Sequence, residues 1–207
     1  MSSHITLKNL SCIFDKRKTD GINDINLTVK KGSIFSLIGP SGSGKTTLLK
    51  CIKGLIKNYQ GEIQFHEETK ISYLDQHIEL PLKMTVIDFL ANEINDGKNS
   101  QDQIINQVRT TLSQLDMTNE IESTIEQLSG GQKQRLIIAK SLITNPTMLL
   151  LDEPFSNLDN ILRKQLLAEL FDFFREQDLT IIWVTHNTDE ALSFSDTIAL
   201  LNFGKIQ

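Results

Sequence analysis

The stretch GPSGSGKTT, which runs from Gly39 to Thr47, indicates the fold of this 207-residue sequence most directly. An apolar run, Ile34–Ile38, comes before it, and the residues from Lys45 onward have the apolar spacing of a helix. Glycines allow backbone N–H groups to turn inward around phosphate oxygens, and the N-terminus of the following helix adds partial positive charge. The sequence therefore predicts a phosphate-binding loop between a buried strand and a helix.

The spacing Gly39-x4-Gly44-Lys45-Thr46 is that of a P-loop, in the expected context between strand and helix. We expect the Lys45 ammonium to bridge the terminal phosphates of a nucleotide and the Thr46 hydroxyl to ligate Mg²⁺. The residues of this loop predicted to bind the nucleotide are Gly39, Pro40, Ser41, Gly42, Ser43, Gly44, Lys45, Thr46 and Thr47.

Apolar periodicity on both sides of the loop predicts an α/β protein. Alternating apolar residues before it, from Ile5 to Val29, indicate strands. Further strands are expected at 62–65, 71–74, 148–151, 180–185 and 197–201. Helices are expected at about 132–142, 161–174 and 189–194. Strands that alternate with helices favour a largely parallel sheet with helices on both faces.

Two of these helices have a predicted buried face. In the helix after the P-loop, that face comprises Leu48, Leu49, Ile52, Leu55 and Ile56. In the helix at 161–174 it comprises Leu162, Leu166, Leu170 and Phe173. Both sets follow the spacing of three to four residues that places side chains on one side of a helix.

Residues from about 77 to 128 differ in composition from the rest, because they are rich in Asn, Gln, Asp and Glu. Ser100 and Gln103 fit a capping box, after which Ile104, Val108 and Leu112 follow at helical spacing. We interpret this segment as a small helical insert in the α/β core, within a single domain that covers residues 1–207.

The overall composition is that of an ordinary globular protein, with 39% hydrophobic and 23% charged residues. A net charge of −5 argues against a surface that binds nucleic acid through its phosphates. No run approaches the ~20 apolar residues that cross a bilayer, and residues 1–10 lack the pattern of a signal peptide. Cys12 and Cys51 are expected to be reduced thiols.

Two adjacent carboxylates, Asp152 and Glu153, follow the apolar run Leu149–Leu151. Ligands of α/β sheets bind at the carboxyl ends of the strands, so this pair is expected beside the P-loop. We expect Asp152 to hold Mg²⁺ through its coordination shell and Glu153 to polarise the water that attacks the γ-phosphate.

The stretch LSGGQKQR, from Leu128 to Arg135, is a glycine turn that opens onto a helix and could form a second anion site. Together with the P-loop, Gln76, Asp152-Glu153 and His186, in this order, it makes the chain resemble the ATP-binding-cassette (ABC) ATPases over nearly its whole length. The resemblance implies a P-loop NTPase core with a mostly parallel sheet, an N-terminal antiparallel β subdomain and an inserted helical subdomain. It also implies that ATP and Mg²⁺ bind.

In such ATPases, ATP on the P-loop of one protomer is capped by the signature loop of another, in a head-to-tail dimer. The resemblance therefore implies that part of this chain serves the ATP of a partner protomer. The residues concerned are Ser129, Gly130, Gly131 and Gln132, with Asp159 crossing the dimer interface. Because both half-sites are complete in one sequence, a homodimer is the simpler expectation.

Three single residues match further loops of the family. Gln76 matches a glutamine that senses Mg²⁺ and the attacking water, and His186 matches a histidine that contacts the γ-phosphate. Phe14 matches the aromatic residue that stacks on adenine, although Tyr is commoner there and a core-strand Phe is the competing interpretation. Since Glu153 is present where degenerate members replace it, the resemblance implies a competent hydrolase.

The stretches EPFSNLD and THNTDEAL look more like importer ATPases than fused exporters. The resemblance thus implies a cytoplasmic subunit on the inner face of the cell membrane, where it drives a separate permease. The permease would dock in the groove between Gln76 and the helical insert. The alternatives are an exporter subunit, a soluble ABC protein acting on DNA or the ribosome, and an ATP-gated switch. With the chain ending about twenty residues after His186, regulation by a C-terminal appendage is not expected.

Overall fold

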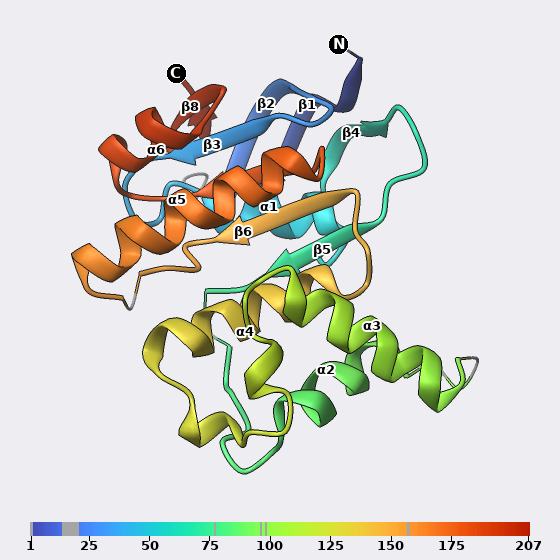
Figure 1. Ribbon diagram of the computed structural model, residues 1–207. Coiled ribbons are helices and arrows are strands. Elements are labelled where there is room, and N and C mark those ends of the chain that lie inside the picture. The colour runs from blue at the N-terminus through green and yellow to red at the C-terminus, as the bar shows by residue number, and fades with distance from the viewer. Residues whose placement is uncertain (1, 14–20, 77, 96, 98, 157) are drawn as a thin grey trace.

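The computed structural model describes residues 2–13, 21–76, 78–95, 97, 99–156 and 158–207 (Figure 1). Its strands are β1 (Ser3–Ile13), β2 (Gly21–Lys30), β3 (Ile34–Ile38), β4 (Gln60–Phe65), β5 (Ile71–Leu74), β6 (Met148–Asp152), β7 (Thr180–Val184), β8 (Thr197–Asn202) and β9 (Lys205–Ile206). Its α-helices are α1 (Lys45–Lys53), α2 (Val86–Ile94), α3 (Gln101–Ser113), α4 (Gly130–Leu142), α5 (Asn160–Glu176) and α6 (Thr188–Phe194). Short 3₁₀ turns, η1 (Thr118–Glu120) and η2 (Ile125–Gln127), precede α4.

The main sheet has the strand order β5-β6-β7-β3-β8-β9. Every pairing in it is parallel except that of the terminal strand β9, which pairs antiparallel with β8. Its central strands are largely apolar, with Ser36 as the polar residue inside β3, because both faces of the sheet are covered. Along β6, Leu149 and Leu151 face one core and Met148 and Leu150 face the other.

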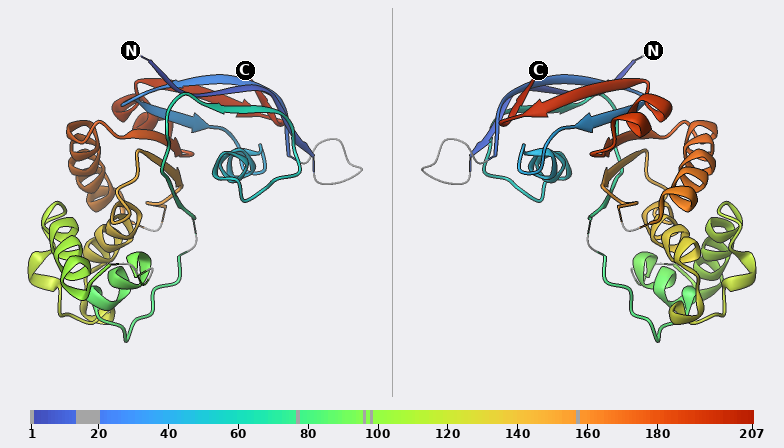
Figure 2. Two further views of the ribbon diagram at one scale, coloured as in Figure 1. Left: turned by 90° about the vertical axis from the view of Figure 1, so that its right-hand side faces the viewer. Right: turned by 90° about the vertical axis from the view of Figure 1, so that its left-hand side faces the viewer.

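These two cores divide the molecule into layers. One core lies between the main sheet, α1 and a smaller antiparallel sheet of order β2-β1-β4. The other core joins the opposite face of the main sheet to α4 and α5, and it continues into α2 and α3. Figure 2 shows the antiparallel sheet across the top of the molecule and α2, α3 and α4 grouped at the opposite end.

The predicted α/β fold class, with a mostly parallel main sheet, an antiparallel N-terminal sheet and helical segments, is confirmed. Strands β3 and β5 have the predicted bounds. The predicted capping box is also present: the Gln103 backbone N–H donates to Ser100 Oγ at 3.3 Å, and the Ser100 N–H donates to Gln103 Oε1 at 2.8 Å. Such a cap satisfies two N–H groups that the first turn of α3 leaves without helical partners.

Two details of the predicted helix faces were wrong. Helix α1 ends at Lys53, where Gly54 adopts a left-handed conformation (φ 79°), so Leu55 lies beyond the helix and is 60% exposed. On α5 the buried face is wider than predicted: Leu167, Phe171 and Phe174 are buried as well. The width arises because α5 packs on a sheet, where the ring of Phe171 contacts Trp183 at a centroid distance of 4.7 Å.

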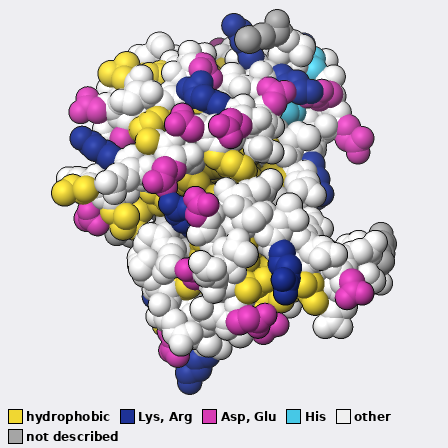
Figure 3. All heavy atoms as spheres, in the orientation of Figure 1, with side chains coloured by type: hydrophobic (Ala, Val, Ile, Leu, Met, Phe, Trp, Pro, Cys, Tyr) yellow, Lys and Arg dark blue, Asp and Glu magenta, His cyan; other side chains and the backbone are white. Residues whose placement is uncertain are grey.

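Neither the surface charges nor the two cysteines indicate a particular function. Among the described residues, no helix has both the length and the apolar character to cross a membrane. On the face drawn in Figure 3, Lys and Arg are scattered among Asp and Glu. Cys12 and Cys51 are unbridged and buried, and burial raises the pKa of the Cys51 thiol to about 12.

Candidate functional site

The candidate site forms where the parallel strands of the main sheet end. Strands β5, β6, β7 and β3 are neighbours in this order, and their carboxyl ends share one edge. The P-loop follows β3, Gln76 follows β5, Glu153 follows β6 and His186 follows β7. Residues that are far apart in the sequence are therefore brought to one edge, the usual ligand site of an open α/β sheet.

Glycines shape the P-loop through close backbone contacts. Gly44 has φ 104°, and a Cβ placed on it would lie 2.5 Å from the carbonyl oxygen of Gly21. A Cβ on Gly39 would lie 2.0 Å from the carbonyl oxygen of Leu201. Neither position can hold a side chain without a shift of the backbone. The loop is thus pressed against β2 and β8, and the N-terminus of α1 is left facing the cavity.

Lys45 is folded back onto its own loop. Its Nζ donates to the carbonyl oxygens of Gly39 and Pro40, both at 2.9 Å. Because an ammonium group has three N–H donors, one remains for a phosphate oxygen. Burial lowers the pKa of Lys45, while the nearby carboxylates of Glu153 and Asp152 act in the opposite direction. An anion bound here would compensate a charge that the fold has partly removed from water.

Asp152 is buried between two hydroxyl groups. It is 2% exposed, Thr46 is hydrogen-bonded to its carboxylate, and the Tyr73 hydroxyl donates to its Oδ2 at 3.3 Å. Burial raises the pKa of Asp152, and the hydrogen bonds from Thr46 and Tyr73 lower it. The Thr46 and Asp152 oxygens are hard donors of the type that Mg²⁺ prefers, so this pair fits the metal that the sequence predicts.

Tyr73 was not predicted as a site residue. In the sequence it is a single tyrosine in a short strand, three residues before Gln76, which was predicted as a site residue. Only the pairing of β5 with β6, which sets Tyr73 opposite Leu150, brings its hydroxyl to Asp152. Gly21, which lines the cavity described below, was missed for the same reason.

Glu153 is the meeting point of the three residues predicted to act in hydrolysis. Its Oε2 accepts a hydrogen bond from Gln76 Nε2 at 3.4 Å and lies 3.3 Å from His186 Nδ1. The backbone of Glu153 is left-handed (φ 48°), an uncommon and strained conformation for a residue with a side chain. Its N–H donates to the carbonyl of Val184, which continues the ladder between β6 and β7 by one step.

A cavity of about 410 Å³ lies between the P-loop and the side chains of Gln76 and Glu153. It is lined by Gly21, Ser41, Gly42, Gly44, Lys45, Thr46, Thr47, Gln76 and Glu153. Of the P-loop residues, Gly39, Pro40 and Ser43 are not part of this lining. A phosphate in the cavity would contact the N-terminus of α1 and Lys45 on one side, with room for a water molecule between it and the Glu153 carboxylate on the other.

The signature stretch lies elsewhere. Among the described residues that line the cavity, none comes from 128–132. Ser129 is the N-cap of α4, where its Oγ accepts from the Gln132 N–H at 3.3 Å, and Gln132 Oε1 accepts from the Ser129 N–H at 2.9 Å. Gln132 Nε2 donates to Glu120. Ser129 and Gly130 are exposed, so this helix N-terminus faces outward.

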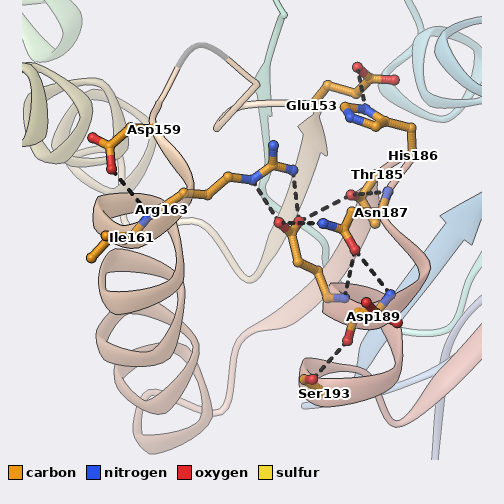
Figure 4. Close-up of polar contacts among 10 residues, drawn as sticks. Glu153, Asp159, Ile161, Arg163, Thr185, His186, Asn187, Asp189 and Ser193 are labelled. Carbon is orange, nitrogen blue, oxygen red and sulfur yellow. Dashed lines mark hydrogen bonds and ion pairs between the residues drawn. The ribbon is translucent and has the colours of Figure 1, made fainter.

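The predicted interface residue Asp159 is the N-cap of α5. Its Oδ1 accepts from the backbone N–H of Ile161 at 3.1 Å (Figure 4) and from that of Leu162 at 3.0 Å. Its side chain is exposed, and Ile161 beside it is 75% exposed. The predicted adenine-stacking residue, Phe14, lies outside the described residues.

Comparison with known proteins identifies the family. A protein-family model described as ABC transporter matches residues 22–156. The chain belongs to the ABC transporter family. The resemblance predicted from LSGGQKQR and the motif order is therefore confirmed at the level of the family.

Two relatives of this chain within the ABC transporter family are named as import ATP-binding proteins. It is 37% identical to the spermidine/putrescine import ATP-binding protein PotA of Borreliella afzelii, covering 98% of this chain and 61% of that protein. It is 36% identical to the sulfate/thiosulfate import ATP-binding protein CysA of Halalkalibacterium halodurans, covering 98% and 60%. The chain thus spans less than two thirds of these relatives' length.

A solved structure supports the fold independently. The structure of cbiO1 from Clostridium perfringens, described as part of the ABC transporter complex cbiONQ, superimposes with a TM-score of 0.88. That comparison covers 100% of this chain and 88% of the other at 24% sequence identity. At this identity the similarity shows the fold, which is that of an ABC ATPase.

Proposed function

We propose that this chain binds and hydrolyses ATP as the ATPase subunit of an ABC importer. The observation that carries the proposal is that Gln76 and His186 both contact Glu153, and that Glu153 and Gln76 line one cavity with the P-loop. As part of this proposal, residues 1–207 form one ATP-binding domain with a helical insert at about 77–128.

In this proposal the P-loop holds the phosphates of ATP. Its backbone N–H groups and Lys45 surround the β- and γ-phosphates. Thr46, Asp152 and Gln76 hold Mg²⁺, because their hydroxyl, carboxylate and amide oxygens are suitable hard ligands. When bound, the metal neutralises the negative charge that develops on the phosphate oxygens.

Hydrolysis is assigned to the contacts of Glu153. Its carboxylate orients and polarises a water molecule toward the γ-phosphate, and Gln76 fixes the orientation of that carboxylate. His186, whose side chain is 56% exposed, is free to contact the γ-phosphate. The left-handed backbone of Glu153 directs the carboxylate to this place before the substrate arrives.

The proposal requires two protomers, because none of the described residues that line the cavity comes from the signature stretch of the same chain. We assign Ser129, Gly130, Gly131 and Gln132 to the ATP of the partner, with Asp159 at the interface. The exposed Ser129 hydroxyl keeps its own proton as a donor, and the N-terminus of α4 adds positive partial charge. Gln132 contributes by holding the cap, since both its side-chain polar atoms have partners within the chain.

The head-to-tail arrangement is tested by mixing two inactive variants, Ser129→Arg and Lys45→Ala. In a mixed dimer, the intact P-loop of the first variant meets the intact signature loop of the second, so one good site forms. Phosphate release should return to about a quarter of the wild-type rate when protomers exchange at random. Mixed dimers that form, as shown by differently tagged protomers, yet stay inactive would contradict the arrangement.

A second prediction concerns Tyr73→Phe. The change removes the hydrogen bond to the Asp152 carboxylate and leaves the ring in place. We expect the Mg²⁺ concentration for half-maximal hydrolysis to rise by about tenfold, as is typical when a partner of a metal ligand is lost. The matched control is Tyr59→Phe, at the half-buried tyrosine before β4. If both variants keep the wild-type Mg²⁺ dependence, Tyr73 has only a packing role.

The partner in the membrane is proposed to dock beside Gln76. A groove of about 350 Å³ lies there between the core and the helical segments. It is lined by Leu74, Asp75, Gln76, Ile78, Glu79, Gln134, Ile137 and Pro154. A permease segment in this groove would contact the side of Gln76 and so sense the state of Glu153. Through this partner the chain would be held at the inner face of the cell membrane.

Import is supported by the relatives, which are named for the import of spermidine/putrescine and of sulfate/thiosulfate. These substrates have opposite charges, yet the identities are nearly equal, at 37% and 36%. We therefore propose that substrate selection lies in the permease and not in this chain. The direct test is purification of the chain with its membrane partner, followed by uptake in vesicles. Substrate movement into vesicles with ATP on the same side as the substrate would contradict import.

A further inference from the structure

A buried ion pair lies outside the cavity, between two helices of the same edge. Arg163 of α5 is 8% exposed and Glu190 of α6 is 4% exposed. Arg163 Nη2 donates to Glu190 Oε2 at 2.8 Å, and Nε lies 2.7 Å from Oε1 as an ion pair without hydrogen-bond alignment (Figure 4). Buried ion pairs seldom stabilise a fold more than apolar residues of similar size. The pair therefore has to be explained by what it positions.

The Glu190 end of the pair holds the loop that carries His186. Thr185 Oγ1 donates to Glu190 Oε2 at 3.4 Å, and Asn187 Nδ2 donates to Oε1 at 3.1 Å. In return, Asn187 Oδ1 accepts from the Glu190 N–H at 3.2 Å, which caps α6. Both neighbours of His186 are thus attached to one carboxylate, while the His186 side chain itself contacts Glu153.

The Arg163 end of the pair belongs to the first turn of α5. The Arg163 N–H donates to the carbonyl oxygen of Asp159 at 2.9 Å, within the first turn that Asp159 caps. Helix α5 begins with exposed groups, including Ile161. The contact between Arg163 and Glu190 therefore connects the exposed Asp159 turn to the His186 loop. Figure 4 labels Asp159 on the left and His186 on the right, with the Arg163 guanidinium between them.

We propose that Arg163 and Glu190 are positioning residues that fix the His186 loop relative to the Asp159 turn, so that contact of the partner protomer at Asp159 sets His186 for hydrolysis. This inference rests on the proposed function, in which Asp159 lies at the dimer interface and His186 contacts the γ-phosphate. Neither Arg163 nor Glu190 lines the cavity among the described residues, so neither acts on ATP directly.

The test is the double variant Arg163→Met/Glu190→Gln. It removes both buried charges at once, so no unpaired charge is left to unfold the chain. The amide carbonyl introduced at position 190 can still accept from Asn187, and its NH2 group can donate to Thr185 Oγ1, so both neighbours of His186 keep a partner while the ion pair to α5 is removed. We expect kcat for ATP hydrolysis to fall about tenfold, with KM and ATP affinity within about twofold of wild type.

Two further variants separate positioning from stability. Arg175→Met removes a contact at the far end of α5, where Arg175 binds Asp196 and the carbonyl of Phe194. It is expected to lower the melting temperature without changing kcat. Arg163→Lys keeps the charge and should retain most of the wild-type kcat. An unchanged kcat in the double variant, measured below all melting temperatures, would overturn the proposal.

A double-mutant cycle tests the connection to the interface. Asp159→Ala is measured alone and together with Arg163→Met/Glu190→Gln. If Asp159 acts through the ion pair, the combined loss in kcat is smaller than the product of the separate losses. Independent losses that multiply would overturn the connection. A wild-type chain that binds ATP and hydrolyses none would instead contradict the proposed function, so the two failures are distinguishable.

Discussion

Glu153→Gln is expected to bind ATP and to hydrolyse it about 10³-fold more slowly than the wild type. Gln keeps the size and one hydrogen-bond acceptor of Glu but has no charge with which to polarise water, and general-base catalysis typically contributes 10²- to 10⁴-fold. Gln76 and His186 both contact Glu153, so in the proposed mechanism both neighbours act through this residue. Steady-state phosphate release and equilibrium ATP binding measure the two effects separately.

The same variant should accumulate as a dimer when saturated with ATP, because uncleaved ATP stays between the P-loop of one protomer and Ser129 of the other. Light scattering with and without ATP measures this. The control is Glu176→Gln at the exposed C-terminal end of α5, which should hydrolyse ATP at the wild-type rate. A monomeric, ATP-saturated Glu153→Gln sample would count against the sandwich arrangement.

Lys45→Ala is expected to weaken ATP binding by about 100-fold, on the order of 3 kcal/mol, because a charge-assisted hydrogen bond to phosphate is lost. Its Nζ also organises the loop by binding the carbonyl oxygens of Gly39 and Pro40. Fluorescent nucleotide titration gives the change in affinity. Unchanged nucleotide affinity would contradict the assignment of the P-loop.

Loss of folding is separated from loss of binding by the melting temperature of the variant without nucleotide. This control is needed because Lys45 is buried and its Nζ holds two carbonyl oxygens of the loop. Lys53→Ala, at the other end of α1, is the matched control. It removes an exposed hydrogen bond to the carbonyl of Ile71 and should leave ATP affinity unchanged.

Prediction from sequence worked where chemistry is local. The apolar run of β3, the glycines of the P-loop and the Ser100–Gln103 cap each depend on residues that are neighbours in the chain. The sequence-based prediction was less accurate where tertiary packing determines which side chains are buried. The two cases are Leu55, which lies beyond the end of α1, and the buried face of α5. There, the partner surface determines which side chains are buried.

Local sequence thus determined the fold class, the P-loop, the carboxylate pair Asp152-Glu153 and the family, because each is a pattern of residue types at short spacing. The tertiary structure alone decided which of these groups meet. The strand order β5-β6-β7-β3 brings Gln76, Glu153 and His186 into contact, adds Tyr73 beside Asp152, and leaves Ser129 facing outward. Strand order depends on long-range pairing, which short patterns in a single sequence do not encode.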